Sequence, residues 1–154
     1  MKVTAPPAFV VHSLEHLRAA LSAGAEAGLP IVALSGPGAS AYAGSSWFSE
    51  LVAAGASEFP GVQLTAILDC GDRAGDALTA LRLGLQYLIF AGNRQAAARL
   101  SRLGATIFER RPEALDLLDI KDPLTAARKY CGNLPVLERS SMQSPTKQSP
   151  ESAS

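Results

Sequence analysis

The chain has 154 residues and a mass of 16.0 kDa, which is the usual size of one domain. Hydrophobic residues make up 47% of it and charged residues 18%, a balance that predicts a folded core. Fourteen basic residues match fourteen acidic ones, and the pI is about 6.7, which argues against a surface for nucleic acid or anionic membrane.

Cysteine content and hydropathy indicate the compartment. Cys70 and Cys131 are too few for a disulfide framework and lack zinc-finger spacing, which suits a reducing cytosol. No apolar run approaches the roughly 20 residues that cross a bilayer, and the first residues lack the cleavage pattern of a signal peptide. We therefore expect a cytoplasmic protein.

Short apolar runs alternate with helical patterns from the start of the chain. The first run, 8–11, is followed by an amphipathic helix over 13–28, and the second, 31–34, by a loop of small residues, SGPGASAYAG. A helix over 46–59, a strand over 62–68 and a helix over 77–84 come next. A strand over 86–90, a helix over 94–104 and a strand over 105–108 complete the pattern. This order predicts an α/β fold with a five-stranded parallel sheet and alternating helices.

Beyond Arg110 the pattern weakens. Short helices are predicted in PEALDLLD (112–119) and PLTAARKY (123–130), the second begun by a proline that suits a first helical turn. The Ser/Pro-rich tail, 140–154, has too little apolar content to order, and we expect it to be disordered. We predict one domain over 1–139 with its core at 8–110.

Ligands of parallel sheets bind where the strands end, and this rule selects the candidate residues. Asp69 follows the third strand directly, where its carboxylate either exchanges protons with a ligand or caps the next turn. The loop after the second strand offers backbone N–H groups to an anion, or is ordinary turn structure. The ligand-binding candidates are Ser35, Gly36, Gly38 and Asn93.

Two residues, His12 and Cys70, are candidates for metal binding. They follow neighbouring strands, but a stable zinc site needs three or four protein ligands, and the only other histidine is His16. For Cys70 the pattern favours a buried, unreactive thiol over a nucleophile. Arg110 and Arg111 follow the fifth strand and are interpreted as a solvated pair, with anion contact as the alternative.

Four stretches resemble the N-terminal half of the class II, metal-dependent ketose-bisphosphate aldolases. AFVVHSLEHLRAALSAGAEAGLPIVAL is similar to the opening of that family, and SGPGASAYAG to its small-residue loop. SWFSELVAAGASEFPGVQLTAILDCGD is similar to the segment that ends in L-D-H-G, and ALTALRLGLQYLIFAGN to the segment that ends in I-D-G-S. The resemblance extends over residues 8–104.

The resemblance implies a truncated TIM barrel, a half barrel, with a flavodoxin-like sandwich as the alternative. It places Asp69 at the catalytic acid/base and Cys70 at a zinc-binding histidine. Val10 replaces an asparagine of the family and Ala91 an aspartate, and a whole barrel takes about 250 residues. The remaining zinc ligands of the family lie in the half that this chain does not contain.

The sequence therefore predicts an aldolase-like domain without a full zinc site, a pseudoenzyme that binds a small phosphorylated or carbonyl ligand or serves a partner subunit. We expect no resident cofactor. Zinc is the possible exception, because Cys70 and His12 are residues of the types that bind it. The alternative is an active metal-dependent carbon-carbon lyase whose site is completed by dimerisation. A sheet of five strands leaves two open edges. Either the segment 110–137 covers an edge, or the sheet flattens into a flavodoxin-like sandwich, or two chains associate. We prefer the homodimer.

Overall fold

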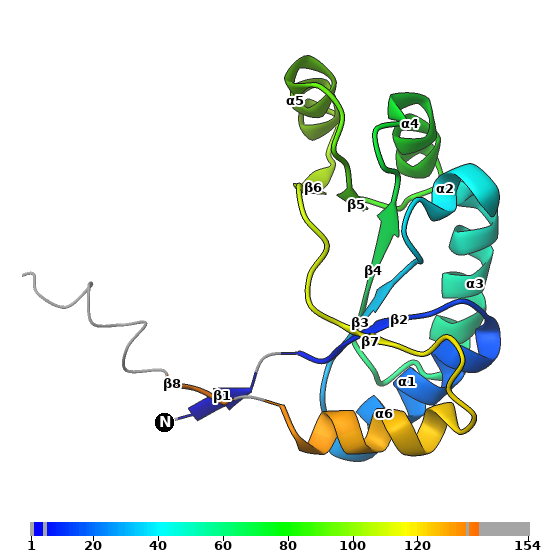
Figure 1. Cartoon of the computed structure of the whole chain (residues 1–154), viewed down its shortest axis with the longest axis vertical. Helices are drawn as coiled ribbons and strands as arrows, with labels where there is room; N and C mark the ends of the chain where they lie inside the picture. Colours follow the sequence, from blue (N-terminus) through cyan, green and yellow to red (C-terminus); the bar gives the residue numbers. More distant parts are fainter. Residues whose placement is uncertain (1, 5, 135, 139–154) are drawn as a thin grey trace, which may run out of the picture.

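The computed structural model describes residues 2–4, 6–134 and 136–138, with side chains for 6–134 (Figure 1). The predicted tail at 140–154 lies outside the described residues. No helix in the described part is long and apolar enough to cross a membrane.

The structure centres on a sheet of six parallel strands in the order β6-β5-β4-β3-β2-β7. The strands are β2 (Ala8–Val10), β3 (Ile31–Leu34), β4 (Leu64–Asp69), β5 (Tyr87–Ile89), β6 (Thr106–Phe108) and β7 (Leu115–Asp116). The first five correspond to the five predicted strands, and the parallel α/β fold is confirmed. A separate antiparallel pair joins β1 (Lys2–Thr4) to β8 (Val136–Glu138).

The sixth strand, β7, corrects the prediction of a helix over 112–119. Leu115 lies opposite Phe9 in parallel register, and the N–H of Leu117 donates to the carbonyl of Val10. The Leu117 side chain is completely buried. Pairing with β2 and burial of this side chain override the weak helical pattern, which is local and carries no information on a partner more than a hundred residues away.

Within the described residues, six helices connect and cover the strands. They are α1 (Leu14–Ala27), α2 (Ala39–Tyr42), α3 (Ser45–Glu58), α4 (Ala74–Arg82), α5 (Arg94–Arg102) and α6 (Pro123–Gly132). The Ser13 hydroxyl caps α1 by accepting from the N–H of His16, and Gly28 ends the helix in the left-handed conformation. The short α2 lies within the small-residue loop SGPGASAYAG, where the sequence predicted no regular structure.

Strand side chains alternate between two apolar clusters. One cluster, formed with the helices, contains Phe9, Leu68 and Leu88, and the other, on the opposite face, contains Val10, Ile67 and Ile89. Both faces of the strands are therefore buried, as their continuous apolar runs predicted. Because successive residues point to opposite faces, this alternation also fixes which face each residue at a strand end reaches.

The sheet is open between β6 and β7, its two edge strands. Residues 109–114 run directly from one edge to the other, and α6 then packs on α1 (Figure 1). The rings of Phe9 and Tyr130 meet edge to face with centroids 5.3 Å apart. The C-terminal segment thus covers the β2 edge, which is one of the three predicted solutions. The β6 edge has no strand partner within the described residues.

Candidate functional site

Polar side chains gather at the carboxyl ends of the parallel strands. His12 follows β2, Ser35 follows β3 and Asp69 ends β4. Arg111 comes from the segment that links β6 to β7 and reaches across to two of these strand ends. We call His12, Ser35, Asp69, Arg111 and Asp116 the rim cluster.

Asp69 is held at the centre of the rim cluster by donors on both carboxylate oxygens. The N–H of Gly71 donates to Oδ1 at 2.9 Å, and Nη1 of Arg111 donates to Oδ2 at 2.7 Å. The Asp69 side chain is 7% exposed, and its backbone N–H donates to Oγ of Ser35 at 2.9 Å. Asp69 is thus a buried carboxylate with an internal cation, an arrangement that compensates its loss of water.

Arg111 is the member of the cluster whose role the sequence missed. Its Nη2 also donates to the carbonyl oxygen of Ser35 at 3.0 Å, so one guanidinium ties β3 to β4. The prediction of a solvated pair is wrong for Arg111, although Arg110 is exposed. The alternative of anion contact gave the right chemistry, but the anion is the protein's own Asp69, 42 residues away.

A histidine–carboxylate pair lies beside the Asp69–Arg111 ion pair. Nε2 of His12 is 2.8 Å from Oδ1 of Asp116, and the N–H of Leu118 donates to the same oxygen. The His12 side chain is 20% exposed and that of Asp116 is 51% exposed. Despite partial burial, the hydrogen bonds from Leu118 and His12 and the charge of Arg111 hold the pKa of Asp116 below its usual value.

His16 supports His12 from inside α1. Its Nδ1 accepts the backbone N–H of His12 at 3.0 Å, and the two imidazole rings meet edge to face. Burial and, to a smaller degree, the neighbouring His12 lower the pKa of His16, against the opposing charges of Glu15 and Asp116. His16 therefore acts as a hydrogen-bond acceptor that orients the backbone at the start of the helix.

Cys70 and His12 do not fit a zinc site. Cys70 faces the helices, in the cluster with Leu68 and Phe90, whereas Asp69 ends the strand on the opposite face. Burial raises the pKa of the Cys70 thiol to about 12, and a zinc ligand must be a thiolate. Within the side chains described, no three His, Cys, Asp or Glu residues are grouped to hold a metal ion.

The remaining candidates have local structural partners. Gly36 is buried, and a side chain there would meet the Tyr42 hydroxyl and the His12 ring, so the loop needs glycine at this position. Gly38 adopts a positive φ of 64° before α2. Oδ1 of Asn93 accepts the N–H of Ala96 and caps α5. Ser35 belongs to the rim cluster and Gly36 borders it beside His12, whereas Gly38 and Asn93 precede α2 and α5.

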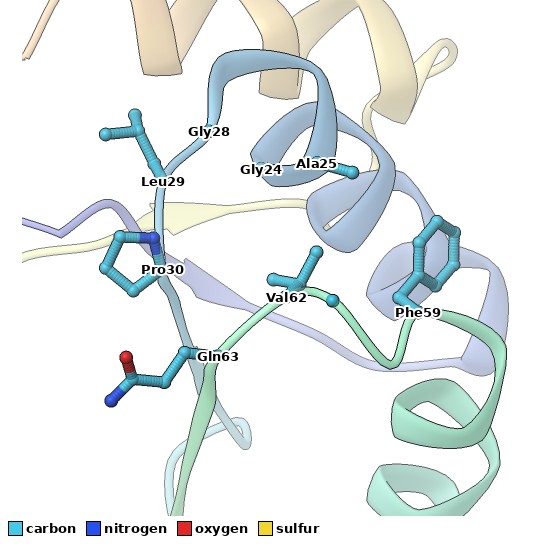
Figure 2. Close-up of a pocket in the computed structure, with 9 residues that line it drawn as sticks. Gly24, Ala25, Gly28, Leu29, Pro30, Phe59, Val62 and Gln63 are labelled. Atoms are coloured by element: carbon cyan, nitrogen blue, oxygen red, sulfur yellow. The ribbon is translucent and has the colours of Figure 1, made fainter.

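A cavity of about 440 Å³ lies at the opposite end of the sheet (Figure 2). It opens between the end of α1 and the start of β4, and its lining consists of Gly24, Ala25, Gly28, Leu29, Pro30, Phe59, Gly61, Val62 and Gln63. None of these side chains is titratable or nucleophilic. The groups that could do chemistry are therefore at the carboxyl ends of the strands.

Comparison with known proteins finds aldolases. The fructose-bisphosphate aldolase of Nostoc commune is 28% identical over 93 residues, which are 60% of this chain and 26% of the aldolase. That of Pseudomonas aeruginosa is 29% identical over 87 residues, which are 56% of this chain and 25% of the aldolase. No protein-family model matches. The chain is aldolase-like in sequence and in its parallel α/β fold, and spans about a quarter of the length of these curated relatives.

Proposed function

We propose that the protein is a non-catalytic relative of the class II aldolases that binds a small phosphorylated or carbonyl ligand at the rim cluster. The observation that carries the proposal is the state of Asp69, the residue at the position of the catalytic acid/base. Protein donors occupy both of its oxygens, and Arg111 neutralises its charge inside the molecule. A ligand at the rim cluster would have to compete with Arg111 and with the N–H of Gly71 for these oxygens.

The neighbouring position supports the same interpretation. Cys70 replaces the histidine that the class II enzymes use for zinc, and its buried thiol faces the helices rather than the rim. A lyase of this class relies on its metal to stabilise the charge that develops on the substrate carbonyl. Among the side chains that the structure describes, no such ligand set lies at Asp69.

Ligand binding rests on the donors that remain partly exposed at the rim. The Arg111 side chain is 28% exposed, and the His12 ring, which shares the neighbour Asp116 with it, is 20% exposed. Guanidinium and imidazole N–H groups match the oxygens of a phosphate or a carbonyl compound. Their positions at the strand ends are those that ligands of parallel α/β proteins use.

The proposal is tested with fructose 1,6-bisphosphate and inorganic phosphate as probes. We expect saturable binding of the sugar phosphate by calorimetry, and binding weakened at least about tenfold by Arg111→Met, as for loss of a charged hydrogen bond. Arg110→Met is the matched control because Arg110 is exposed. It should bind like the unmodified protein. Urea unfolding of each variant verifies that both variants are folded.

Two results would contradict the proposal. Cleavage of the bisphosphate in the presence of one equivalent of zinc, lost in Asp69→Asn, would favour the alternative of an active lyase. The second is binding of the sugar phosphate that Arg111→Met leaves unchanged and for which inorganic phosphate does not compete. That result would rule out a ligand site at the rim cluster.

A further inference from the structure

The α4–α5 groove lies between two neighbouring helices that cover the sheet. Figure 1 shows the two helices side by side above β5 and β6. A cavity of about 450 Å³ opens between them. It is lined by Leu78, Leu81, Arg82, Arg99 and Leu103, residues that define the α4–α5 groove.

Two of the large apolar side chains that the described surface exposes lie at or beside the groove. Leu103 is 56% exposed, and Leu83, next to Arg82, is 41% exposed. A smaller apolar cavity of about 50 Å³ lies beneath, between Leu78 and Leu100. Single exposed leucines are ordinary, but leucines that converge on a hollow can accommodate an inserted side chain.

The arginines of the groove have no acidic partner among the described side chains. Arg18 of α1 binds Glu58 with two hydrogen bonds, and Arg128 of α6 binds Glu26 in the same way. By contrast, α5 carries three arginines and no acidic residue. In α4 the single carboxylate, Asp76, is already paired with Arg73. Arg82 and Arg99 thus lack carboxylate partners within the part of the chain that the structure describes.

We propose that the α4–α5 groove binds an acidic amphipathic helix of a partner protein. An apolar side chain of that helix enters between Leu78, Leu81 and Leu103, and carboxylates flanking it pair with Arg82 and Arg99. This occupant satisfies both features of the groove at once, its apolar floor and its unpaired positive charge. Arginine is well suited to the role because its planar guanidinium binds carboxylates through two hydrogen bonds.

The shape of the surface favours a peptide over a membrane or a nucleic acid. A bilayer needs apolar side chains that protrude, whereas these leucines line a hollow. A nucleic acid needs an extended basic surface with side chains that reach the bases, whereas the floor of this groove is leucine and the chain carries no net charge.

The test uses a labelled synthetic peptide of about four helical turns, with leucine on one face and glutamate on the other. A peptide with the same leucines and lysine in place of glutamate is the matched probe. We expect fluorescence anisotropy to show saturable binding of the glutamate peptide to the full chain, and binding at least about tenfold weaker for the lysine peptide.

Variants of the protein locate the site. Arg99→Glu and Leu103→Ser should each weaken binding about tenfold, and Lys129→Glu, an exposed charge reversal on α6, should leave it unchanged. Far-ultraviolet circular dichroism verifies that each variant is folded. Arg99→Gln, which removes the charge without reversing it, is used if Arg99→Glu does not fold. Equal binding of the two peptides, or an Arg99 variant that binds normally, would overturn the proposal. So would binding of anionic vesicles or single-stranded DNA at the groove in preference to the glutamate peptide.

Discussion

Arg111 changes the chemistry of a carboxylate without altering the strand that carries it. Asp69 stands at the end of β4, where an acid/base is expected, yet its oxygens are occupied by Gly71 and Arg111. The same guanidinium bonds the Ser35 carbonyl, so it also connects two strand ends. A single side chain thereby gives the carboxylate a cationic partner and joins the ends of β3 and β4.

His16 allows the electrostatics near the rim to be tested by pH. Burial and the neighbouring His12 lower its pKa below the ordinary 6.5 of the unfolded chain. As the pH falls through 6.5 the unfolded state takes up a proton that the folded state resists, so stability present at neutral pH is lost on acidification. We predict that His16→Asn, which keeps an acceptor for the His12 N–H, flattens this loss.

The measurement is the free energy of unfolding in urea at several pH values between 7.5 and 5. Asp116 and Asp76, whose pKa values the fold lowers from the ordinary 3.8, stay ionised over this range and affect both proteins alike. The two curves should diverge only below about pH 6.5. Parallel curves across the whole range would show that His16 ionises as freely in the folded as in the unfolded chain.

Glycine as well as leucine determines how closely neighbouring helices pack in this protein. In α3, a methyl group on Gly55 would lie 2.5 Å from Cδ2 of Leu17 and 2.9 Å from its Cγ, so α1 and α3 approach closely at this point. In α4, Gly75 has nothing within 4 Å of the same methyl position. The same residue type therefore has a packing role in one helix and none in the other.

We predict opposite effects of one substitution in these two helices. Gly55→Ala should lower the free energy of unfolding by about 1 to 3 kcal/mol, because the buried Leu17 must move in a packed core. Gly75→Ala should raise it by about 0.5 to 1 kcal/mol, because alanine favours the helix and meets no neighbour. Urea unfolding of the two variants checks both signs, and a stabilising Gly55→Ala would contradict the close packing of α1 on α3.

The elements that the sequence predicted well are those with a strong local signal. The β-branched apolar run at β3 and the Ser13 and Gly28 caps of α1 encode their structure within a few residues. The two-residue β7 depends on distant β2 for its formation, so local periodicity at Leu115 could not reveal it. The position of Asp69 and Ser35 at the rim follows from strand ends, but their contact with Arg111 depends on the three-dimensional path of 109–114.

At the scale of the whole molecule, the C-terminal segment completes the fold. It adds β7 to the β2 edge, buries Leu117 and places α6 on α1. It also carries Arg111, so the segment that covers the sheet edge is the segment that neutralises Asp69. Fold and rim cluster are therefore coupled through the same stretch of chain.

We predict that a chain ending at Arg110 fails to unfold cooperatively. It would expose the β2 edge, the ring of Phe9 and the face of α1 that α6 covers, an apolar edge of the kind that aggregates. Thermal melts followed by circular dichroism, with light scattering, measure this. A chain ending at Glu138 retains every element described and is the control. A sharp melt of the shorter chain at the control's midpoint would show that residues 8–110 suffice.

The place of β7 beside β2 has a consequence for engineering. In a closed eight-stranded cylinder the last strand lies parallel to the first, and β7 takes that place here although the sheet has only six strands. The link at 109–114 spans the open side of the sheet, from β6 to β7. An insertion in that link would meet β6 on one side and β7 on the other, and it preserves the rim cluster only where Arg111 still reaches Asp69 and Ser35.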